Sequence, residues 1–166
     1  MRKLFAASLF FVSTFALAAG PAPQAFFSTM LGKLSGTGIA SSTFPGANPT
    51  TREVKVEQST RETRPGTWEV TLTVTANSRS TQTITAYEMH DGTFDVVSKT
   101  YAATAEILKN TDQVLEFRTS HSDPTTHRMV EVRRVLTWET DGSLNFENEI
   151  IQDGVQVQQS HYKLRR

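Results

Sequence analysis

The stretch Leu31-Gly32-Lys33-Leu34-Ser35-Gly36-Thr37-Gly38 marks a change in the character of the sequence. A short apolar segment with helical spacing precedes it, and most segments after it alternate with period two. Three glycines, at positions 32, 36 and 38, leave one face of the predicted first strand almost without side chains. Such a strand tolerates a tight bend or the close approach of another backbone. The stretch therefore predicts the opening strand of a β-barrel.

A short helix is predicted just before this strand. Phe26, Phe27, Met30 and Leu31 stand at i, i+1, i+4 and i+5, a spacing that places apolar side chains on one helical face. We expect this helix to cap an open end of the barrel, within a linker and plug segment that spans residues 19–33. The alternative is a flexible leader whose phenylalanines have no fixed place.

Residues 1–18 have the pattern of a secretory signal peptide. Arg2 and Lys3 precede an uncharged apolar run, and Ala16-Leu17-Ala18 matches a cleavage site. The run is shorter than the ~20 residues that cross a bilayer, and no other segment approaches that length. We therefore expect an exported protein, periplasmic or secreted, with no integral membrane span.

Composition narrows the classes of function. The chain has no cysteine, which excludes disulfides, thiol nucleophiles and cysteine zinc sites and leaves the fold to be held by its core. Without Arg2 and Lys3, acidic residues outnumber basic ones by two, whereas a nucleic-acid partner requires a basic face. The remaining length suits one domain, and we place the barrel at residues 34–166.

The clearest strand carries Trp68, Val70, Leu72 and Val74, which alternate with threonine and glutamate. This alternation predicts one buried face. Other predicted strands cover residues 53–62, 81–89, 93–100, 104–108, 113–120, 128–140, 143–152 and 155–164.

Turn signals separate these strands. Asp91-Gly92, Asp141-Gly142 and Asp153-Gly154 predict type I′ hairpin turns, because glycine accepts the positive φ that such a turn demands. Consecutive strands are then antiparallel neighbours. A meander this long must close or leave two exposed edges. We predict an all-β fold, a single antiparallel up-and-down β-barrel of about 8–10 strands with a short N-terminal helical plug. A two-sheet sandwich is the competing architecture.

The two ends of this predicted barrel resemble the calycin group, the lipocalin-like barrels. Those proteins pair a short N-terminal helix with a G-x-W motif and place an arginine near the end of the last strand. Gly32-Lys33-Leu34 occupies the place of the G-x-W motif, with leucine instead of tryptophan. Arg165 or Arg166 occupies the place of the arginine. Ser35-Gly36-Thr37-Gly38 and Pro45-Gly46 are similar to the G-x-G and downstream proline of the nitrobindin-like haem-binding barrels. The resemblance implies an exported barrel that binds a small molecule.

Six residues are predicted to line a ligand site in the lumen. They are Trp68, Tyr87, Met89, Trp138, Gln159 and His161. Gln159 and His161 share a strand face with Val155 and Val157, so they point inward if the valines mark the interior. They would then fix the orientation of a ligand, and in a haem-binding barrel His161 would be the iron ligand. The opposite face carries Tyr162 and gives the alternative assignment.

Catalytic and metal-binding patterns are weak. The sequence has no G-x-S-x-G, no H-E-x-x-H and no glycine-rich phosphate loop, so an enzyme is disfavoured. His121 and His127 flank a turn with Asp123, which supplies fewer ligands than a typical zinc site. The cofactor is left open.

Two functions remain. The first is an exported protein that holds an apolar or amphipathic small molecule in the barrel lumen. The second is a non-catalytic envelope or partner-binding module with a packed interior. A pocket of at least a few hundred Å³ favours the first.

Overall fold

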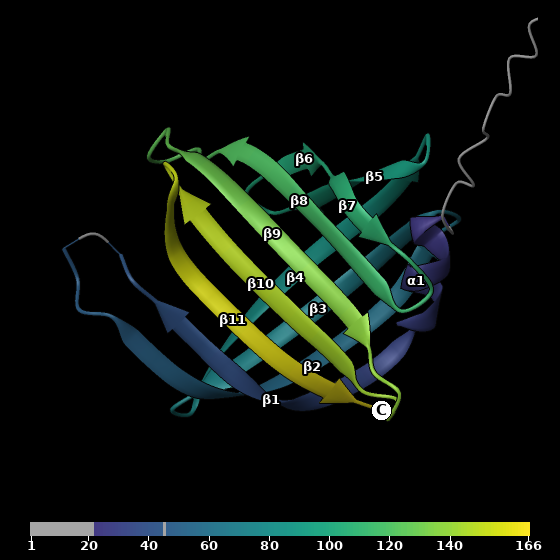
Figure 1. The fold of residues 1–166 in the computed structure, drawn as a ribbon, viewed down its shortest axis with the longest axis horizontal. Coiled ribbons are helices and arrows are strands. Elements are labelled where there is room, and N and C mark those ends of the chain that lie inside the picture. Colours follow the sequence, from purple (N-terminus) through teal and green to yellow (C-terminus); the bar gives the residue numbers. More distant parts are fainter. Residues whose placement is uncertain (1–21, 45) are drawn as a thin grey trace, which may run out of the picture.

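The computed structural model describes residues 22–44 and 46–166. Within these residues, one short helix, α1 (Pro23–Thr29), precedes eleven strands that form a single antiparallel sheet (Figure 1). The strands are β1 (Gly32–Ser42), β2 (Thr50–Arg64), β3 (Thr67–Ala76), β4 (Arg79–His90), β5 (Thr93–Ser98), β6 (Ala102–Thr104), β7 (Glu106–Asn110), β8 (Val114–Ser122), β9 (Met129–Trp138), β10 (Leu144–Gln152) and β11 (Val155–Arg165). The predicted signal peptide, residues 1–18, lies outside the described residues. No helix in the described part of the chain is long and apolar enough to cross a membrane.

The sheet follows an up-and-down order that curls into a nearly closed barrel. The strand order is β6-β5-β4-β3-β2-β1-β11-β10-β9-β8-β7, so the first and last strands of the chain pair with each other. The two ends of the sheet, β6 and β7, are separated by Ala105 alone. The Ala105 N–H donates to the Phe94 carbonyl at 2.8 Å, and the Thr93 hydroxyl donates to the Ala105 carbonyl at 2.7 Å. The predicted barrel is confirmed, and its segment near residues 104–108 is divided into two short strands.

Close contact between β1 and β11 depends on two of the three early glycines. A Cβ atom at Gly36 would overlap the carbonyl oxygen of Lys163, and one at Gly38 would overlap that of His161. Both positions lie in the β1–β11 ladder, where Gly36 faces Leu164. The predicted close approach of two backbones is therefore confirmed.

The helix α1 closes one end of the barrel, as predicted (Figure 1). Proline at its beginning is favourable, because the first turn of a helix does not use that N–H group. Phe26, Phe27 and Met30 are buried, whereas Leu31 lies beyond the helix and is exposed. The Phe27 ring centroid lies 4.6 Å from that of Tyr87.

Strand β3 has the predicted orientation. Trp68 and Val70 are buried, and Leu72 and Val74 are partly buried against the same core. Burial along this face decreases with distance from α1.

The pairing of β10 with β11 contains a β-bulge. Ile150 faces Gln158, whereas Ile151 faces Gln156, so Val157 is the additional residue. A bulge of this kind changes which residues of a strand face the interior.

The bulge reverses the expected faces of the last strand. Tyr162 and Leu164 are buried, while Gln159 and His161 are exposed. His161 Nδ1 lies 3.7 Å from a carboxylate oxygen of Glu147 on the outer surface. The inward orientation predicted for Gln159 and His161 is wrong, and the alternative with Tyr162 inside is correct.

Two of the three Asp-Gly pairs have the predicted turn geometry. Both residues have positive φ at Asp91-Gly92 and at Asp153-Gly154, as a type I′ turn requires. At Asp141-Gly142 only the glycine has a positive φ. There the Asp141 carboxylate accepts a hydrogen bond from the Ser143 N–H at 3.0 Å, which stabilises a different turn.

Candidate functional site

The barrel wall has an opening at the end away from α1. The last pair between β4 and β5 joins Thr85 to Ser98, so the β4 segment Arg79–Ile84 lacks a ladder partner on that side among the described residues. Across the gap, the last pair between β7 and β8 joins Glu106 to Arg118, and β8 continues to Ser122. Strand β4 therefore extends past the end of its pairing with β5, and β8 extends past the end of its pairing with β7.

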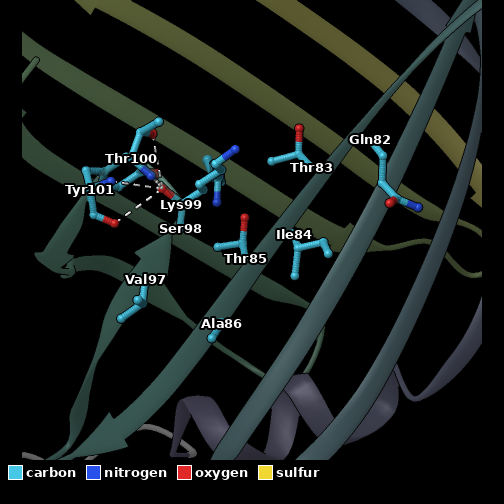
Figure 2. A pocket seen from close by; sticks show the side chains of 11 residues that line it. Gln82, Thr83, Ile84, Thr85, Ala86, Val97, Ser98, Lys99, Thr100 and Tyr101 are labelled. Carbon is cyan, nitrogen blue, oxygen red and sulfur yellow. Dashed lines mark hydrogen bonds between the residues drawn. The ribbon is translucent and has the colours of Figure 1, made fainter. Parts of the chain in front are cut away.

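A cavity of about 590 Å³ lies at this opening (Figure 2). Residues 82–86 of β4 line one side, residues 97–101 line another, and Arg134 of β9 completes the lining. Small-molecule pockets typically measure roughly 300–1,000 Å³. The cavity has the volume to hold a small ligand.

Arg134 is the charged group of β9 that faces the interior. Its neighbours on the same face, Val132 and Leu136, are buried. Its Nε donates to Asn148 Oδ1 at 3.1 Å, and its Nη1 donates to the Tyr87 hydroxyl at 2.7 Å. These two bonds connect β9 to β10 and, across the lumen, to β4.

The partners of Arg134 are neutral. Burial raises the pKa of the Tyr87 phenol, so that this group stays protonated at neutral pH. For the Arg134 guanidinium, burial acts to lower the pKa, but Tyr87 and Tyr101 together outweigh it and the pKa is raised. Arginine remains charged in proteins. The cavity therefore has a permanent positive charge beside uncharged hydroxyl and amide groups.

Tyr101 and His121 lie against each other across the opening. Their rings stack with centroids 3.8 Å apart and planes 4° apart. Tyr101 is held by a tight turn in which the Ser98 N–H donates to its carbonyl at 2.8 Å, and its own N–H donates to the Ser98 hydroxyl at 3.2 Å. Burial lowers the pKa of His121, while Asp123 acts in the opposite direction. The described part of the chain contains no group of three or more His, Asp or Glu side chains placed to hold a metal ion.

None of the six predicted site residues is among those that line this cavity. Trp68 and Tyr87 belong to the aromatic core, and Met89 packs against it. The Trp138 indole N–H donates to the Thr29 hydroxyl at 2.7 Å, at the end closed by α1. Of these four, Tyr87 alone is joined to the cavity lining, through Arg134. Ligand contact by these four residues stays a prediction.

Sequence reasoning missed Arg134, Tyr101 and Lys99. A signal for Arg134 was present, because it shares strand parity with Leu136 and with Trp138, which was assigned inward. No comparable local signal marks Tyr101 or Lys99, since both lie in the turn after β5.

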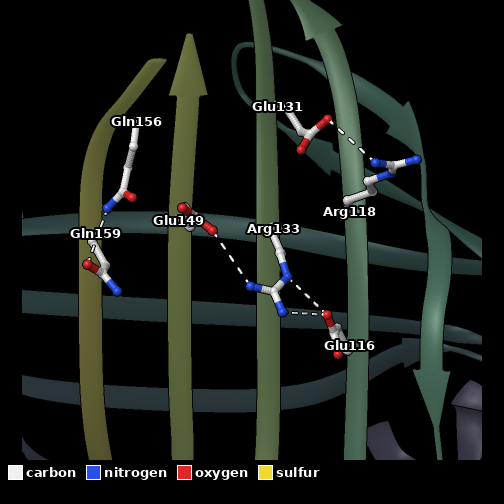
Figure 3. A network of polar contacts seen from close by, with 7 residues as sticks. All are labelled: Glu116, Arg118, Glu131, Arg133, Glu149, Gln156 and Gln159. Carbon is white, nitrogen blue, oxygen red and sulfur yellow. Dashed lines mark hydrogen bonds and ion pairs between the residues drawn. The ribbon is translucent and has the colours of Figure 1, made fainter. Parts of the chain in front are cut away.

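The neighbouring Arg133 has the opposite environment (Figure 3). It lies on the outer face, where its Nη2 donates to Glu116 at 2.7 Å and its Nη1 lies 3.7 Å from Glu149. Adjacent arginines on one strand are thus paired with carboxylates outside the barrel and with neutral groups inside it.

Comparisons with known proteins give the fold. No protein-family model matches this chain, and no curated protein is similar to it in sequence. A crystal structure of Rv2717c from M. tuberculosis is similar, with a TM-score of 0.60 and 16% sequence identity over 89% of this chain and 98% of that one. At this identity the similarity shows a shared barrel architecture.

Proposed function

We propose that this protein binds a small amphipathic molecule in the open half of its barrel. The cavity of about 590 Å³ at the wall opening carries this proposal. At the other end, aromatic side chains and α1 fill the interior. The space for a ligand is therefore confined to the half that the helix does not close.

The cavity lining has the mixed chemistry that an amphipathic molecule requires. Ile84, Ala86 and Val97 supply apolar surface from the outward-facing side at the free edge of β4, whereas Thr83 and Thr85 supply hydroxyl groups from the inward-facing side. Binding sites for small molecules combine apolar walls with a few polar groups that set orientation.

Export and kinship with the lipocalin-like barrels are part of the proposal. The signal-peptide pattern of residues 1–18 supports export. The glycine-rich first strand and the terminal arginines support the kinship, since Arg166 Nη2 donates to the Thr29 carbonyl at 2.8 Å and links the chain end to α1.

Cavity filling tests the binding proposal. A fluorescent long-chain alcohol and the matching fatty acid would be titrated into the wild-type protein, Thr83→Trp and Thr51→Trp. Thr83 lines the cavity, whereas Thr51 is exposed on β2. We expect saturable binding of at least one probe to the wild type and to Thr51→Trp, and a loss of about tenfold or more in affinity for Thr83→Trp.

Two results would contradict the proposal. One is the absence of saturable binding of either probe to the wild type. The other is an equal affinity in Thr83→Trp when its thermal unfolding matches that of the wild type. Either result would favour the alternative, a packed barrel that acts through its outer surface.

A further inference from the structure

The inward position of Arg134 distinguishes it from the other arginines of the barrel. Arg61, Arg64, Arg118, Arg128, Arg133 and Arg165 each lie within 4.0 Å of a carboxylate. Arg134 has no such ion pair among the described residues, although it is partly buried. Arg52, Arg79 and Arg166 also lack one there, but they are exposed to water, which solvates their charge.

The hydrogen bonds of Arg134 leave part of its guanidinium unused. A guanidinium carries five N–H donors. One bond goes to Asn148 and one to Tyr87. The remaining donors belong to a group that lines the cavity. A planar cation with free donors matches the geometry of a carboxylate or phosphate group.

The charge of the cavity lining also favours an anionic ligand. Lys99 and Arg134 are its charged lining residues, and the lining includes no aspartate or glutamate. Lys99 is exposed at the turn after β5 (Figure 2). The ion pairs that involve Glu116, Glu131 and Glu149 lie on the outer face (Figure 3). A buried positive charge without a counter-charge is costly, and an anionic ligand would supply that counter-charge.

We propose that Arg134 binds the anionic head group, a carboxylate or a phosphate monoester, of the amphipathic ligand. This inference rests on the proposed function, because the ligand's apolar part occupies the same cavity. Tyr101, which lines the same cavity, is held in place by its stacking on His121. Lys99 at the rim adds attraction that salt would screen.

A purely structural role for Arg134 makes a different prediction. If Arg134 only connected β9 to Asn148 and Tyr87, its loss would change stability and leave the preference for a head group unaltered. The decisive measurement is therefore the ratio of affinities for a charged and an uncharged head group on the same chain.

The test uses a fluorescent long-chain fatty acid and the alcohol of equal length. Hexadecyl phosphate and inorganic phosphate serve as competitors that distinguish an alkyl phosphate from the free anion. The variants are Arg134→Met and the matched control Arg133→Met, which removes a cation from the outer face. We expect the wild type and Arg133→Met to prefer the acid over the alcohol by about tenfold or more. Arg134→Met should lose this preference while its affinity for the alcohol is retained.

Each outcome decides between the two proposals. If the wild type binds acid and alcohol equally, or if Arg134→Met keeps the preference, the head-group inference is wrong and the binding proposal stands. If the wild type binds neither probe nor the alkyl phosphate, both are wrong. If inorganic phosphate displaces the fatty acid and hexadecyl phosphate does not, the inference of an anion site is supported and the proposal of an amphipathic ligand is contradicted.

The Lys99→Met variant provides a second measurement if Arg134→Met does not fold. Its preference for the fatty acid over the alcohol should persist at high salt, because a pair made by the partly buried Arg134 is screened less than a surface pair. Loss of the preference in Lys99→Met would assign the head group to the rim cation and overturn the inference.

Discussion

The two ends of the barrel are built from the same strands, yet they differ in packing. At the α1 end, ring centroids of Phe27, Trp68, Tyr87, Phe94 and Phe117 lie 4.6 to 6.1 Å apart in a continuous cluster. At the other end, β4 and β8 extend past their partners and leave a cavity beside Arg134. The difference indicates that one end supplies most of the stability and that the other end contains the free volume.

The sequence of a single strand contains this difference. The inward residues of β4 run from Tyr87 through Thr85 to Thr83, from buried to exposed. Those of β8 run from Phe117 through Thr119 to His121. Side chains that are large and apolar near α1 become smaller or polar towards the opening, so burial falls along each strand.

Loss of Phe27 should have the largest effect on the closed end. Phe27→Ala removes a fully buried ring and should lower the free energy of unfolding by about 3–5 kcal/mol. Leu72→Ala is the control, because Leu72 is only partly buried, and its cost should be clearly smaller. Urea unfolding measures both. Equal costs would show that the two ends contribute equally to stability.

The contact of β1 with β11 should be the next most sensitive feature. Gly36→Ala places a Cβ against the Lys163 carbonyl, and overpacking of this kind costs roughly 1–3 kcal/mol. Thr37→Ala, at the next and exposed position, should have little effect. Chemical denaturation of both variants provides the comparison. A Gly36→Ala protein as stable as the wild type would mean that this part of the wall adjusts as readily as the open end.

Local pattern predicted the closed end well. The alternation around Trp68 and Leu72 indicated the inward face of β3, and the spacing of Phe26 and Phe27 predicted the plug. These features are local, since each depends on the period of a few consecutive residues.

The open end depends on strand pairing, which alternation alone does not reveal. The bulge at Val157 arises from the register with β10 and reverses the faces of Gln159 and His161. The cavity exists because β5 stops at Ser98 while β4 starts at Arg79. The parity rule that placed Trp138 inside the barrel also predicts an inward position for Arg134, because the two residues are four positions apart on the same strand.

The link between α1 and the barrel rim should have a moderate effect. Trp138→Phe keeps an aromatic ring but removes the indole N–H that donates to Thr29, and one hydrogen bond contributes about 0.5–1.5 kcal/mol. Thr29→Val removes the other partner. In a double-mutant cycle measured by urea unfolding, the two changes should cost less together than the sum of their single effects. Strict additivity would show that this bond does not hold the plug.

The smallest expected effect is a pH dependence of the open end. Burial lowers the pKa of His121 below its ordinary value near 6.5, and the unfolded chain keeps that ordinary value. As the pH falls below about 6.5, the unfolded state therefore binds the proton first, and stability decreases.

His121→Phe isolates this contribution, because it keeps a ring stacked on Tyr101 and cannot titrate. Asp95, Asp123 and Asp141 have lowered pKa values as well, but they lose their contribution at more acidic pH and are present in both proteins. Between pH 7.5 and pH 5.5, the midpoint of urea unfolding should fall further for the wild type than for His121→Phe. Equal decreases would place His121 in an environment as hydrated as the unfolded chain, and the stack that spans the opening would then be open to water.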